Sequence, residues 1–512
     1  MKIGVFDRFW QTTGGGERFA GGIAEALSDE HEVSIIGPAP IDREFLSERL
    51  HLDLTRVSIH ELGEKESAAE ASRSYDLFIN ASFTSHDVNR APLGMYVVHF
   101  PDRKFTKSFG TRTLDAVGPR LTRGHGAITC VNGFHDAESN RFCQYRWTNG
   151  NGVLEVQKPG ELTLAFGHFV LGRKERNVRI VVNGKCVDEF VLMPSRSKFE
   201  VVLPLKRKVL LTDSTSIVEI ESEASEPHEY LDNGDHRKLG VPLVAAFLGK
   251  QPLGVPLTNI SMHWLPSPDH HWLDTYQMVL ANSKFTQGWI EKWWEVESEI
   301  LEPPVTMYPA GEKTKTIVSV GRFFPPGRGH AKMQHELVAA FKQLHESGAA
   351  EGWELHLAGG CSPKDESYLN EVKDLAAGLP VHFHINATGA EVASLYTHAS
   401  VYWHATGLGL RLEKDPISAE HFGITTVEAM SAGCVPIVVA SGGQPDIVRN
   451  GVSGFLFSSR EELTSITAAV INDPPRMKQL GENAARDAQY YSTKEFKTRL
   501  RDYVNRLAES AS

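Results

Sequence analysis

The chain has 512 residues, of which 41% are hydrophobic, with 44 glycines and 26 prolines, so it is a globular protein too long for a single hydrophobic core. Its formal net charge of −11 argues against a nucleic-acid binder that works mainly by neutralising phosphates. Five cysteines without a CxxC pair, an apolar start too short for a signal peptide and no run of about 18 apolar residues favour a cytoplasmic protein that meets a membrane only peripherally.

The first segment predicts alternating strands and helices. An apolar strand at 2–6 precedes the turn Gly14-Gly15-Gly16, a helix with apolar residues spaced from Phe19 to Leu27, and a strand at 33–36. Such a turn presents bare backbone amides at the carboxyl edge of a parallel sheet, where ligands bind in open α/β folds. Loop flexibility is the alternative explanation of three adjacent glycines. Further strands are expected at 77–81 and 96–100.

Two features after these strands concern ligands. His99 lies at the carboxyl end of the strand at 96–100, where a side chain reaches the edge of a site, and a packed strand-end histidine is the alternative. The segment from Arg103 to Arg123 carries six basic residues with Phe105 and Phe109 between them. It can dock onto an anionic surface, such as lipid head groups or an acceptor's diphosphate, although a solvated loop has the same composition.

From about Cys130 the pattern changes to strands alone. Segments with partial alternation of apolar and polar residues predict strands at 153–157, 161–171, 178–182, 187–192, 199–203 and 216–222. Asn183-Gly184 between apolar runs is typical of a type I′ hairpin. Because no helical pattern of useful length interrupts this region, we expect an inserted β-sandwich over 130–250. Trp147 and Tyr230 are candidate sugar-binding aromatics, although for Trp147 a place in the core is the preferred interpretation.

The alternating pattern then resumes. A strand at 276–281 is followed by Asn282-Ser283, which caps a helix, and prolines with the polar stretch 311–315 indicate a hinge between domains. A second α/β domain opens with the strand 316–320 and then Gly321-Arg322, with Lys332 ten residues beyond the arginine. A planar guanidinium and a compact ammonium beside a strand end suit a diphosphate, and Arg328 is the alternative second cation. Strands at 354–358, 381–385 and 401–404 continue this sheet, and a capping box at 492–495 opens a final helix.

Glu420 and Glu428 mark the stretch with the strongest functional signal. Eight steps of about 100° leave them roughly 80° apart on a continuous helix, so Glu420 is expected to end a loop and Glu428 to lie one turn into a helix that starts near Thr425. Gly423 lets the backbone approach a ligand, and the free N–H groups at the helix start favour phosphate. A pair of solvated glutamates around a helix start is the alternative.

This stretch, with the strand 433–440 and the glycine turn at 442–443 that follow it, resembles the donor-binding signature of retaining family 4 glycosyltransferases of the GT-B fold, of the bacterial surface-polysaccharide type. The resemblance implies that Glu420 meets the donor sugar, Glu428 the ribose, Arg322 and Lys332 the diphosphate, and His99 the sugar. It implies further nucleotide-sugar contacts at the following positions: Gly15, Gly16, Ile385, Asn386, Phe422, Gly423, Ile424 and Thr425. Gly133-Phe134, Arg146-Trp147-Thr148 and the segment 237–241 are loosely similar to jelly-roll inserts of such enzymes.

The predicted fold is therefore α/β, with two Rossmann-like doubly wound domains and an inserted all-β sandwich. The expected domains are 1–129 and 251–310 for the acceptor half, 130–250 for the insert, 311–490 for the donor half and 491–512 for a helix that crosses back. The predicted function is sugar transfer from a nucleotide-diphosphate sugar to a glycan or lipid-linked acceptor, with no cofactor, no metal and no nucleic-acid partner. A sugar phosphorylase or nucleotide-sugar hydrolase on the same fold, and a non-catalytic glycan-binding protein, are the alternatives.

Overall fold

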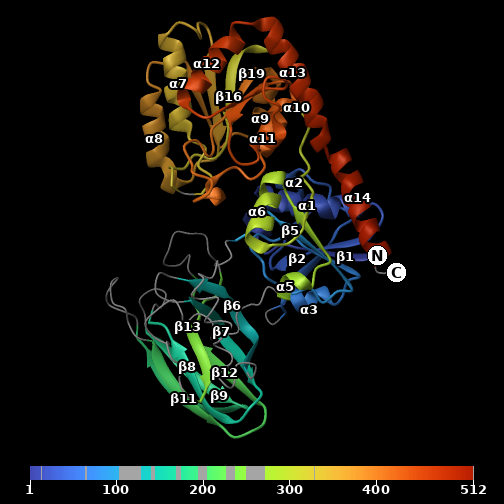
Figure 1. Ribbon diagram of the computed structural model, residues 1–512, viewed down its shortest axis with the longest axis vertical. Coiled ribbons are helices and arrows are strands. Elements are labelled where there is room, and N and C mark those ends of the chain that lie inside the picture. Colours follow the sequence, from blue (N-terminus) through green and yellow to red (C-terminus); the bar gives the residue numbers. More distant parts are fainter. Residues whose placement is uncertain are drawn as a thin grey trace. The chain divides into compact units, whose positions relative to one another are not determined.

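The computed structural model describes residues 1–12, 14–63, 66–102, 128–139, 144–168, 175–193, 204–226, 237–249, 271–327 and 329–510. The chain divides into two compact units, Met1–Lys104 with Leu273–Ser512, and Phe105–Trp272 (Figure 1). The predicted basic segment from Arg103 to Arg123, the predicted strand 199–203, Tyr230 and Arg328 lie outside the described residues. Within the described residues, every helix is too short or too polar to span a bilayer.

The N-terminal domain of the first unit is built on a parallel sheet with strand order β15-β14-β5-β4-β1-β2-β3. Its strands are β1 Lys2–Phe6, β2 Glu32–Pro38, β3 Ser58–Leu62, β4 Leu77–Asn80, β5 Leu93–Val98, β14 Met278–Ala281 and β15 Glu299–Ile300. Its described helices are α1 Gly15–Leu27, α2 Arg43–Leu50, α3 Ala68–Ser72 and α6 Lys284–Trp294, and the short helix α5 His271–Asp274 contains the chain boundary between the two units. Strand β14 pairs in parallel with β5, so the chain after residue 278 continues the sheet begun by residues 1–98. The predicted strand 96–100 includes His99, but β5 ends at Val98, so His99 lies just beyond the strand.

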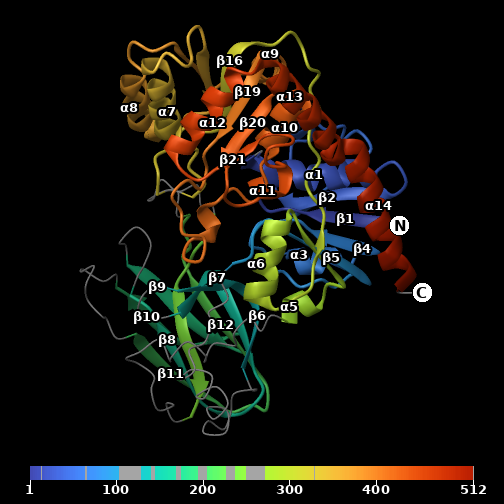
Figure 2. The same ribbon diagram turned by 45° about the horizontal axis from the view of Figure 1, so that its top comes forward.

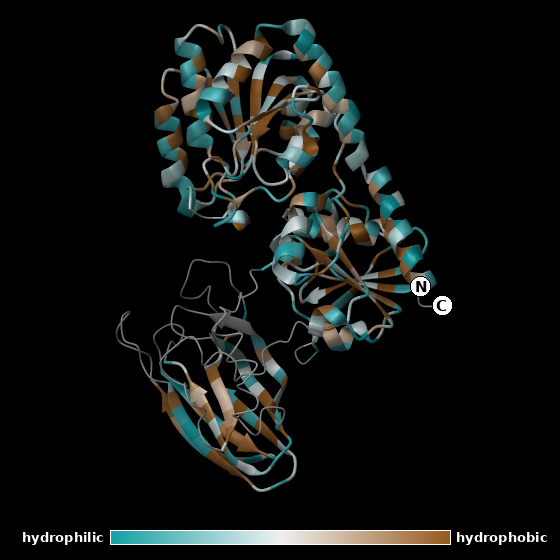
Figure 3. Ribbon diagram, viewed as in Figure 1, coloured by the Kyte–Doolittle hydropathy of each residue, from teal (hydrophilic) through white to brown (hydrophobic). Residues whose placement is uncertain are grey.

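The C-terminal domain has a second parallel sheet with strand order β18-β17-β16-β19-β20-β21. Its strands are β16 Thr314–Val320, β17 Glu354–Gly359, β18 Val381–Ile385, β19 Ala399–His404, β20 Val435–Val439 and β21 Phe455–Phe457. The helices are α7 Gln334–Glu346, α8 Glu366–Leu375, α9 Gly389–His398, α10 Ile424–Ser431, α11 Gln444–Ile447, α12 Arg460–Ile471 and α13 Pro474–Ala488. Figure 3 shows the apolar residues concentrated in the strands of both parallel sheets.

Each face of this sheet has its own hydrophobic cluster. Helices α7, α8 and α12 contribute Phe341, Val372 and Leu463 to a cluster on one face, which includes Leu357 of β17. Helices α9, α10 and α13 contribute to the cluster on the other face, which includes Val318 of β16 but no described residue of β17 or β18. On the second face the cluster covers the middle strands, whereas Glu354 of β17 and His382 of β18 are about half exposed.

Helix α14, Thr493–Ser510, follows the C-terminal domain but packs on the N-terminal one (Figure 2). Its buried residues, Phe496, Leu500, Val504 and Leu507, belong to the same cluster as the core of α1 and β1. Phe496 meets Phe19 of α1 edge-on, with ring centroids 5.9 Å apart. The C-terminal end of the chain thus ties the two parallel-sheet domains together.

The second unit contains one eight-stranded antiparallel sheet with order β10-β9-β12-β7-β13-β8-β11, and β6 pairs with β7. Its strands are β6 Ile128–Ser139, β7 Gln144–Val156, β8 Gly160–Phe166, β9 Arg176–Val182, β10 Lys185–Leu192, β11 Leu205–Leu211, β12 Ser216–Ser222 and β13 Pro242–Leu248. The start of β7 pairs with β13 and its end with β12, so this strand belongs to both halves of the sheet. Val178 of β9 and Leu164 of β8 share one hydrophobic cluster, because the two halves fold over a common core. The predicted hairpin turn lies at Asn183-Gly184, both with positive φ. Trp147 is 6% exposed, which favours the core alternative.

Candidate active site

Helix α10 and the loop before it place the two glutamates as their spacing predicts. Glu420 precedes the helix, Gly423 is its N-cap, and Glu428 lies on the fifth residue of the helix. Gly423 has φ of 121°, and a Cβ atom there would lie 2.3 Å from Nε2 of Gln444, so glycine is required for both conformation and space. Gly442 is also required, because a Cβ atom would lie 2.1 Å from the Glu420 carbonyl oxygen. The glycine turn after β20 therefore shapes the loop that carries Glu420.

Glu420 is held by two cationic or potentially cationic side chains. Lys332 Nζ forms an ion pair with the Glu420 carboxylate, and His404 Nε2 donates to the same carboxylate at 3.1 Å. Burial alone would raise the pKa of Glu420, but Lys332 and His404 hold that pKa well below its ordinary value. Glu420 is thus a carboxylate throughout the neutral pH range and can accept hydrogen bonds from sugar hydroxyls.

Three buried polar side-chain atoms without a partner lie at or just beyond the carboxyl ends of β19 and β20. His404 Nδ1, Thr406 Oγ1 and Ser441 Oγ are buried and have no hydrogen-bond partner. Ser441 lies beside the Glu420 loop, since a Cβ atom on Gly407 would be 2.8 Å from Ser441 Oγ and 3.7 Å from the Ala419 Cα atom. Buried polar groups are normally satisfied, so unsatisfied ones next to a buried carboxylate fit a site for a polar ligand.

The two predicted phosphate-binding cations flank the end of β16. The Lys332 side chain runs across Gly321, where a Cβ atom would lie 2.5 Å from Lys332 Cγ. Arg322 is exposed and forms no ion pair among the described residues; its guanidinium carbon lies 5.9 Å from the centroid of the Phe324 ring. His330 donates from Nδ1 to the Ala419 carbonyl at 2.7 Å, which ties the long loop before Lys332 to Glu420. The arginine is therefore available for an anion, and the lysine is already oriented.

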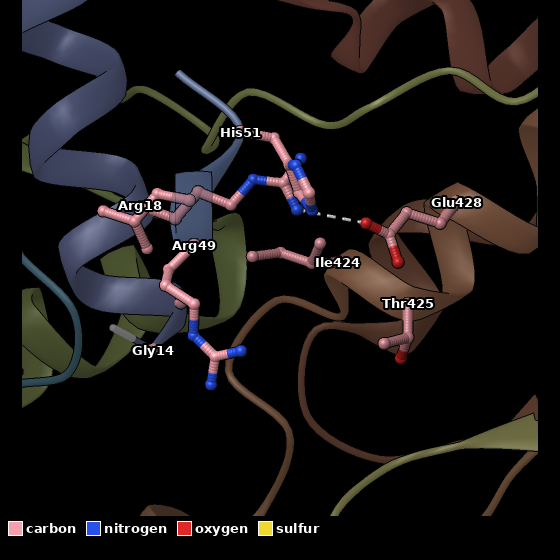
Figure 4. Close-up of a pocket in the computed structure, with 9 residues that line it drawn as sticks. Gly14, Arg18, Arg49, His51, Ile424, Thr425 and Glu428 are labelled. Atoms are coloured by element: carbon pink, nitrogen blue, oxygen red, sulfur yellow. Dashed lines mark hydrogen bonds and ion pairs between the residues drawn. The ribbon is translucent and has the colours of Figure 1, made fainter. Parts of the chain in front are cut away.

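Glu428 is engaged by groups that the sequence analysis does not identify. Arg18 Nη1 of α1 donates to Glu428 Oε1 at 3.1 Å (Figure 4). The Tyr396 hydroxyl of α9 donates to Glu428 Oε2 at 3.3 Å. Arg18 also contacts Thr306 Oγ1. Burial raises the pKa of Glu428, and Arg18 opposes that shift. Glu428 is thus buried, with one carboxyl oxygen bonded to the N-terminal domain through Arg18 and the other to the C-terminal domain through Tyr396.

A cavity of about 310 Å³ opens beside Glu428. It is lined by the following residues: Gly14, Gly15, Arg18, Arg49, Leu50, His51, Ile424, Thr425 and Glu428 (Figure 4). Arg18 and Arg49 give this cavity two guanidinium groups, and the start of α10 adds backbone N–H groups. Such a lining suits an anionic ligand. Arg49 and His51 are absent from the sequence-based prediction because they lie at the end of α2, far along the chain from any motif.

The glycine turn and His99 lie together at the carboxyl edge of the N-terminal sheet. Gly16 faces His99, since a Cβ atom on Gly16 would be 3.5 Å from His99 Cε1. Gly15 faces Ile424, since a Cβ atom on Gly15 would be 3.5 Å from Ile424 Cδ1. His99 Nε2 donates to the Ala81 carbonyl at 2.7 Å, and burial lowers the pKa of His99. The ring is therefore neutral at physiological pH, with Nε2 already used.

The remaining predicted residues divide into two groups. Ile385 ends β18, and the backbone N–H of Asn386 donates to the Gly359 carbonyl at 2.9 Å. Ile385 and Asn386 therefore lie at the carboxyl edge of the C-terminal sheet, as expected. Phe422 is different, because its side chain is 5% exposed and packs in the core against Tyr491, with ring centroids 5.4 Å apart. A ligand contact at Phe422 is therefore limited to its backbone.

Part of the chain resembles known glycosyltransferases. Residues 308–487 match the family model described as glycosyl transferases group 1. A GDP-Man:Man(3)GlcNAc(2)-PP-Dol alpha-1,2-mannosyltransferase of Mus musculus is 30% identical over 242 residues, which are 43% of this chain and 46% of that protein. The chain spans about half the length of the curated relatives that it matches.

Two solved structures resemble nearly the whole chain. HepE of Anabaena in complex with UDP has a TM-score of 0.52 and 14% identity, covering 99% of this chain and 100% of that one. Sucrose-phosphate synthase of Thermosynechococcus elongatus also has a TM-score of 0.52, with 13% identity over 100% of both chains. The predicted GT-B fold is therefore confirmed, and residues 308–487 resemble glycosyl transferases group 1.

Proposed function

We propose that this chain is a retaining glycosyltransferase that moves a sugar from a nucleotide-diphosphate sugar to a hydroxyl of a glycan or lipid-linked acceptor. The observation that carries the proposal is the half-buried Glu420 carboxylate, which Lys332 and His404 both contact. A carboxylate that accepts sugar hydroxyls here contacts one cation that suits a diphosphate, and the exposed Arg322 guanidinium, two residues beyond β16, can supply a second.

The proposed reaction needs positioning and charge stabilisation rather than a covalent intermediate on the enzyme. The bond from the anomeric carbon to the diphosphate oxygen breaks, and the acceptor oxygen bonds to that carbon on the same face. The acceptor's proton passes to the leaving diphosphate oxygen. Arg322, Lys332 and the amides at the start of α10 stabilise the charge that grows on the diphosphate. Glu428 binds the ribose, and His99 and Glu420 bind the donor sugar. No metal is part of this step.

GDP-mannose is the donor that we propose to test first. The relatives that support it are named for GDP-Man, whereas HepE was solved with UDP and with UDP-glucose. The mannosyltransferase relatives are also named for an acceptor joined through a diphosphate to a lipid. We therefore propose a lipid-linked saccharide acceptor, met at a membrane surface from the cytoplasm, in the assembly of a cell-surface glycan. The antiparallel unit would be an inserted sandwich that holds this acceptor.

The test is incubation of the purified chain with GDP-mannose, GDP-glucose, UDP-glucose and UDP-galactose, each with and without a diphosphate-linked saccharide. Expected is release of one nucleoside diphosphate that depends on the acceptor, with an α-linked product by NMR. Release that is independent of acceptor indicates a hydrolase, and a sugar phosphate formed from a glycan and phosphate indicates a phosphorylase. Binding of glycan without any turnover, in protein that binds no nucleotide, would leave the non-catalytic alternative.

A further inference from the structure

A cluster of histidines lies on the C-terminal sheet away from the proposed donor site. His356 of β17 pairs in register with His382 of β18, and Glu354 lies two residues before His356. Because residues two apart on a strand point to the same face, Glu354, His356, His382 and His384 all project from one face of the sheet. No motif in the sequence marks these residues, which are 26 to 30 positions apart across the two strands. The cluster forms only when the two strands are paired.

This face of the two strands is open to solvent. The alternate residues Leu355, Leu357 and Phe383 pack under α7 and α8 on the opposite face. The hydrophobic cluster under α9 and α10 contains no described residue of β17 or β18. The side chains of Glu354 and His382 are 50% and 49% exposed, whereas that of His356 is 17% exposed. A small ion can therefore reach the cluster without any rearrangement of the helices.

The ligand atoms converge on one point. His356 Nε2 lies 3.3 Å from Glu354 Oε2, and His382 Nε2 lies 3.6 Å from the same oxygen. One ligand atom from each of the three residues lies within 4.8 Å of the others. In a tetrahedral zinc site with bonds of about 2.0–2.1 Å, neighbouring ligand atoms are roughly 3.3 Å apart. The two separations from Glu354 Oε2, 3.3 Å and 3.6 Å, thus match the edges of such a site to within a few tenths of an ångström.

His384 supports this arrangement from the second side of the His356 ring. His384 Nε2 lies 3.0 Å from His356 Nδ1, and the two rings stack with centroids 5.1 Å apart. With its Nδ1 committed to this hydrogen bond, His356 presents Nε2 to the point where the other ligand atoms meet. Metal-binding histidines commonly have such a partner on their other ring nitrogen, which fixes tautomer and orientation.

We propose that Glu354, His356 and His382 form a binding site for a divalent transition-metal ion such as Zn²⁺, with His384 as a positioning residue. Two imidazoles and a carboxylate suit zinc and its neighbours rather than Mg²⁺ or Ca²⁺, which take oxygen ligands. Three protein ligands leave a fourth position for water or for a group of another molecule. His382 lies three residues before Ile385, so the site is about 10 Å along the strand from the nucleotide-binding edge. The proposal does not depend on the proposed function.

The test uses the full chain without a polyhistidine tag, at pH 7.5, where an ordinary imidazole is neutral. ZnCl₂ is titrated by calorimetry, and CoCl₂ is added to record the visible absorption of tetrahedral cobalt. Expected are one tight site per chain, the cobalt spectrum, and a rise in the thermal midpoint with zinc. His382→Ala should weaken zinc binding at least about 10-fold and abolish the cobalt spectrum, and His384→Ala should weaken it by about 10-fold. His345→Ala removes an exposed histidine of α7 and should change nothing.

Two results would overturn the proposal. The first is a dissociation constant for zinc above about 0.1 mM in the wild-type protein, because scattered surface histidines bind zinc only that weakly. The second is zinc binding that His382→Ala and His384→Ala leave unchanged, because the ion then sits elsewhere, for example on the exposed thiol of Cys186. Both variants change partly or largely exposed side chains, and an unchanged midpoint without zinc shows that they fold.

Discussion

The ribose assignment of Glu428 is tested most directly by Glu428→Gln, which keeps the shape of the side chain and its bond from Arg18 but removes the charge. Each carboxylate oxygen accepts one hydrogen bond in the structure, Oε1 from Arg18 and Oε2 from Tyr396. Each oxygen has a second lone pair, so both can also accept a ribose hydroxyl. Hydrogen bonds to a charged group contribute about 1.5–3 kcal/mol, which is roughly 10- to 150-fold in Kd.

Calorimetry with ribonucleotides and their 2′,3′-dideoxy forms isolates this contribution. Wild-type protein should prefer GDP or UDP, whichever binds, over its dideoxy form by roughly 10- to 150-fold. In Glu428→Gln the preference should fall close to parity, because the charged acceptor that distinguishes the two ligands is gone. Glu420→Gln is the matched control and should keep the wild-type preference, since Glu420 is assigned to the donor sugar.

The comparison of ratios makes the outcome decisive. Should Glu428→Gln discriminate the two nucleotides as well as the wild type does, Glu428 does not bind the ribose. A loss of preference in Glu420→Gln instead would reverse the two assignments. Thermal unfolding of each variant checks that the Arg18 contact still joins α1 to α10.

Three further predictions concern the two predicted phosphate-binding cations, a buried histidine and the antiparallel unit. Arg322→Ala and Lys332→Ala should each raise the barrier to transfer by about 2–4 kcal/mol, or roughly 30- to 1000-fold in rate, while the protein stays folded. Near-normal turnover of either variant would show that its side chain does not bind the leaving diphosphate. Burial against Phe100 and His330 lowers the pKa of His421 to about 3. Between about pH 3 and 6.5 this histidine is therefore protonated in the unfolded chain and neutral in the folded one, so the free energy of unfolding decreases as the pH falls. His421→Phe should therefore reduce the slope of unfolding free energy against pH by about 1.4 kcal/mol per unit between about pH 4 and 6, and an unchanged slope would contradict this. Replacing residues 105–272 by a Gly/Ser linker should preserve the rate of transfer to a short acceptor and reduce the rate of transfer to the long native acceptor. If the replacement changes both rates equally, the antiparallel unit does not bind the acceptor and has a structural role.

Local chemistry explains what the sequence predicts well. The start of α10 is predictable because Gly423 is flanked by a loop carboxylate and an apolar helix, and the structure begins the helix at Ile424. The hairpin at Asn183-Gly184 follows from the positive φ angles that a type I′ turn requires. In both cases the residues that determine the conformation are neighbours in the chain.

Contacts between distant segments explain what the sequence does not predict. Arg18 and Glu428 are separated by 410 positions, and no spacing rule connects them. His356 and His382 meet only because β17 pairs with β18 in one particular register, which depends on how both strands bury their other face. Phe422 lies within the predicted ligand-binding stretch, yet its side chain fills the core, because a loop next to a helix start must also anchor itself.

The Lys332–Glu420 pair implies that the two predicted functions of these residues are coupled. An ammonium group has three donors, so Lys332 can keep its contact with Glu420 while it donates to a phosphate oxygen. Glu420 thereby restricts the lysine to one position before the donor arrives, which lowers the ordering cost on binding by about 0.5–1.5 kcal/mol. Removing the Glu420 charge should therefore weaken nucleotide binding through Lys332 as well as sugar binding, although it should not alter the preference for ribose. For this reason the ribose-to-dideoxyribose ratio, and not the absolute affinity, separates the functions of the two glutamates.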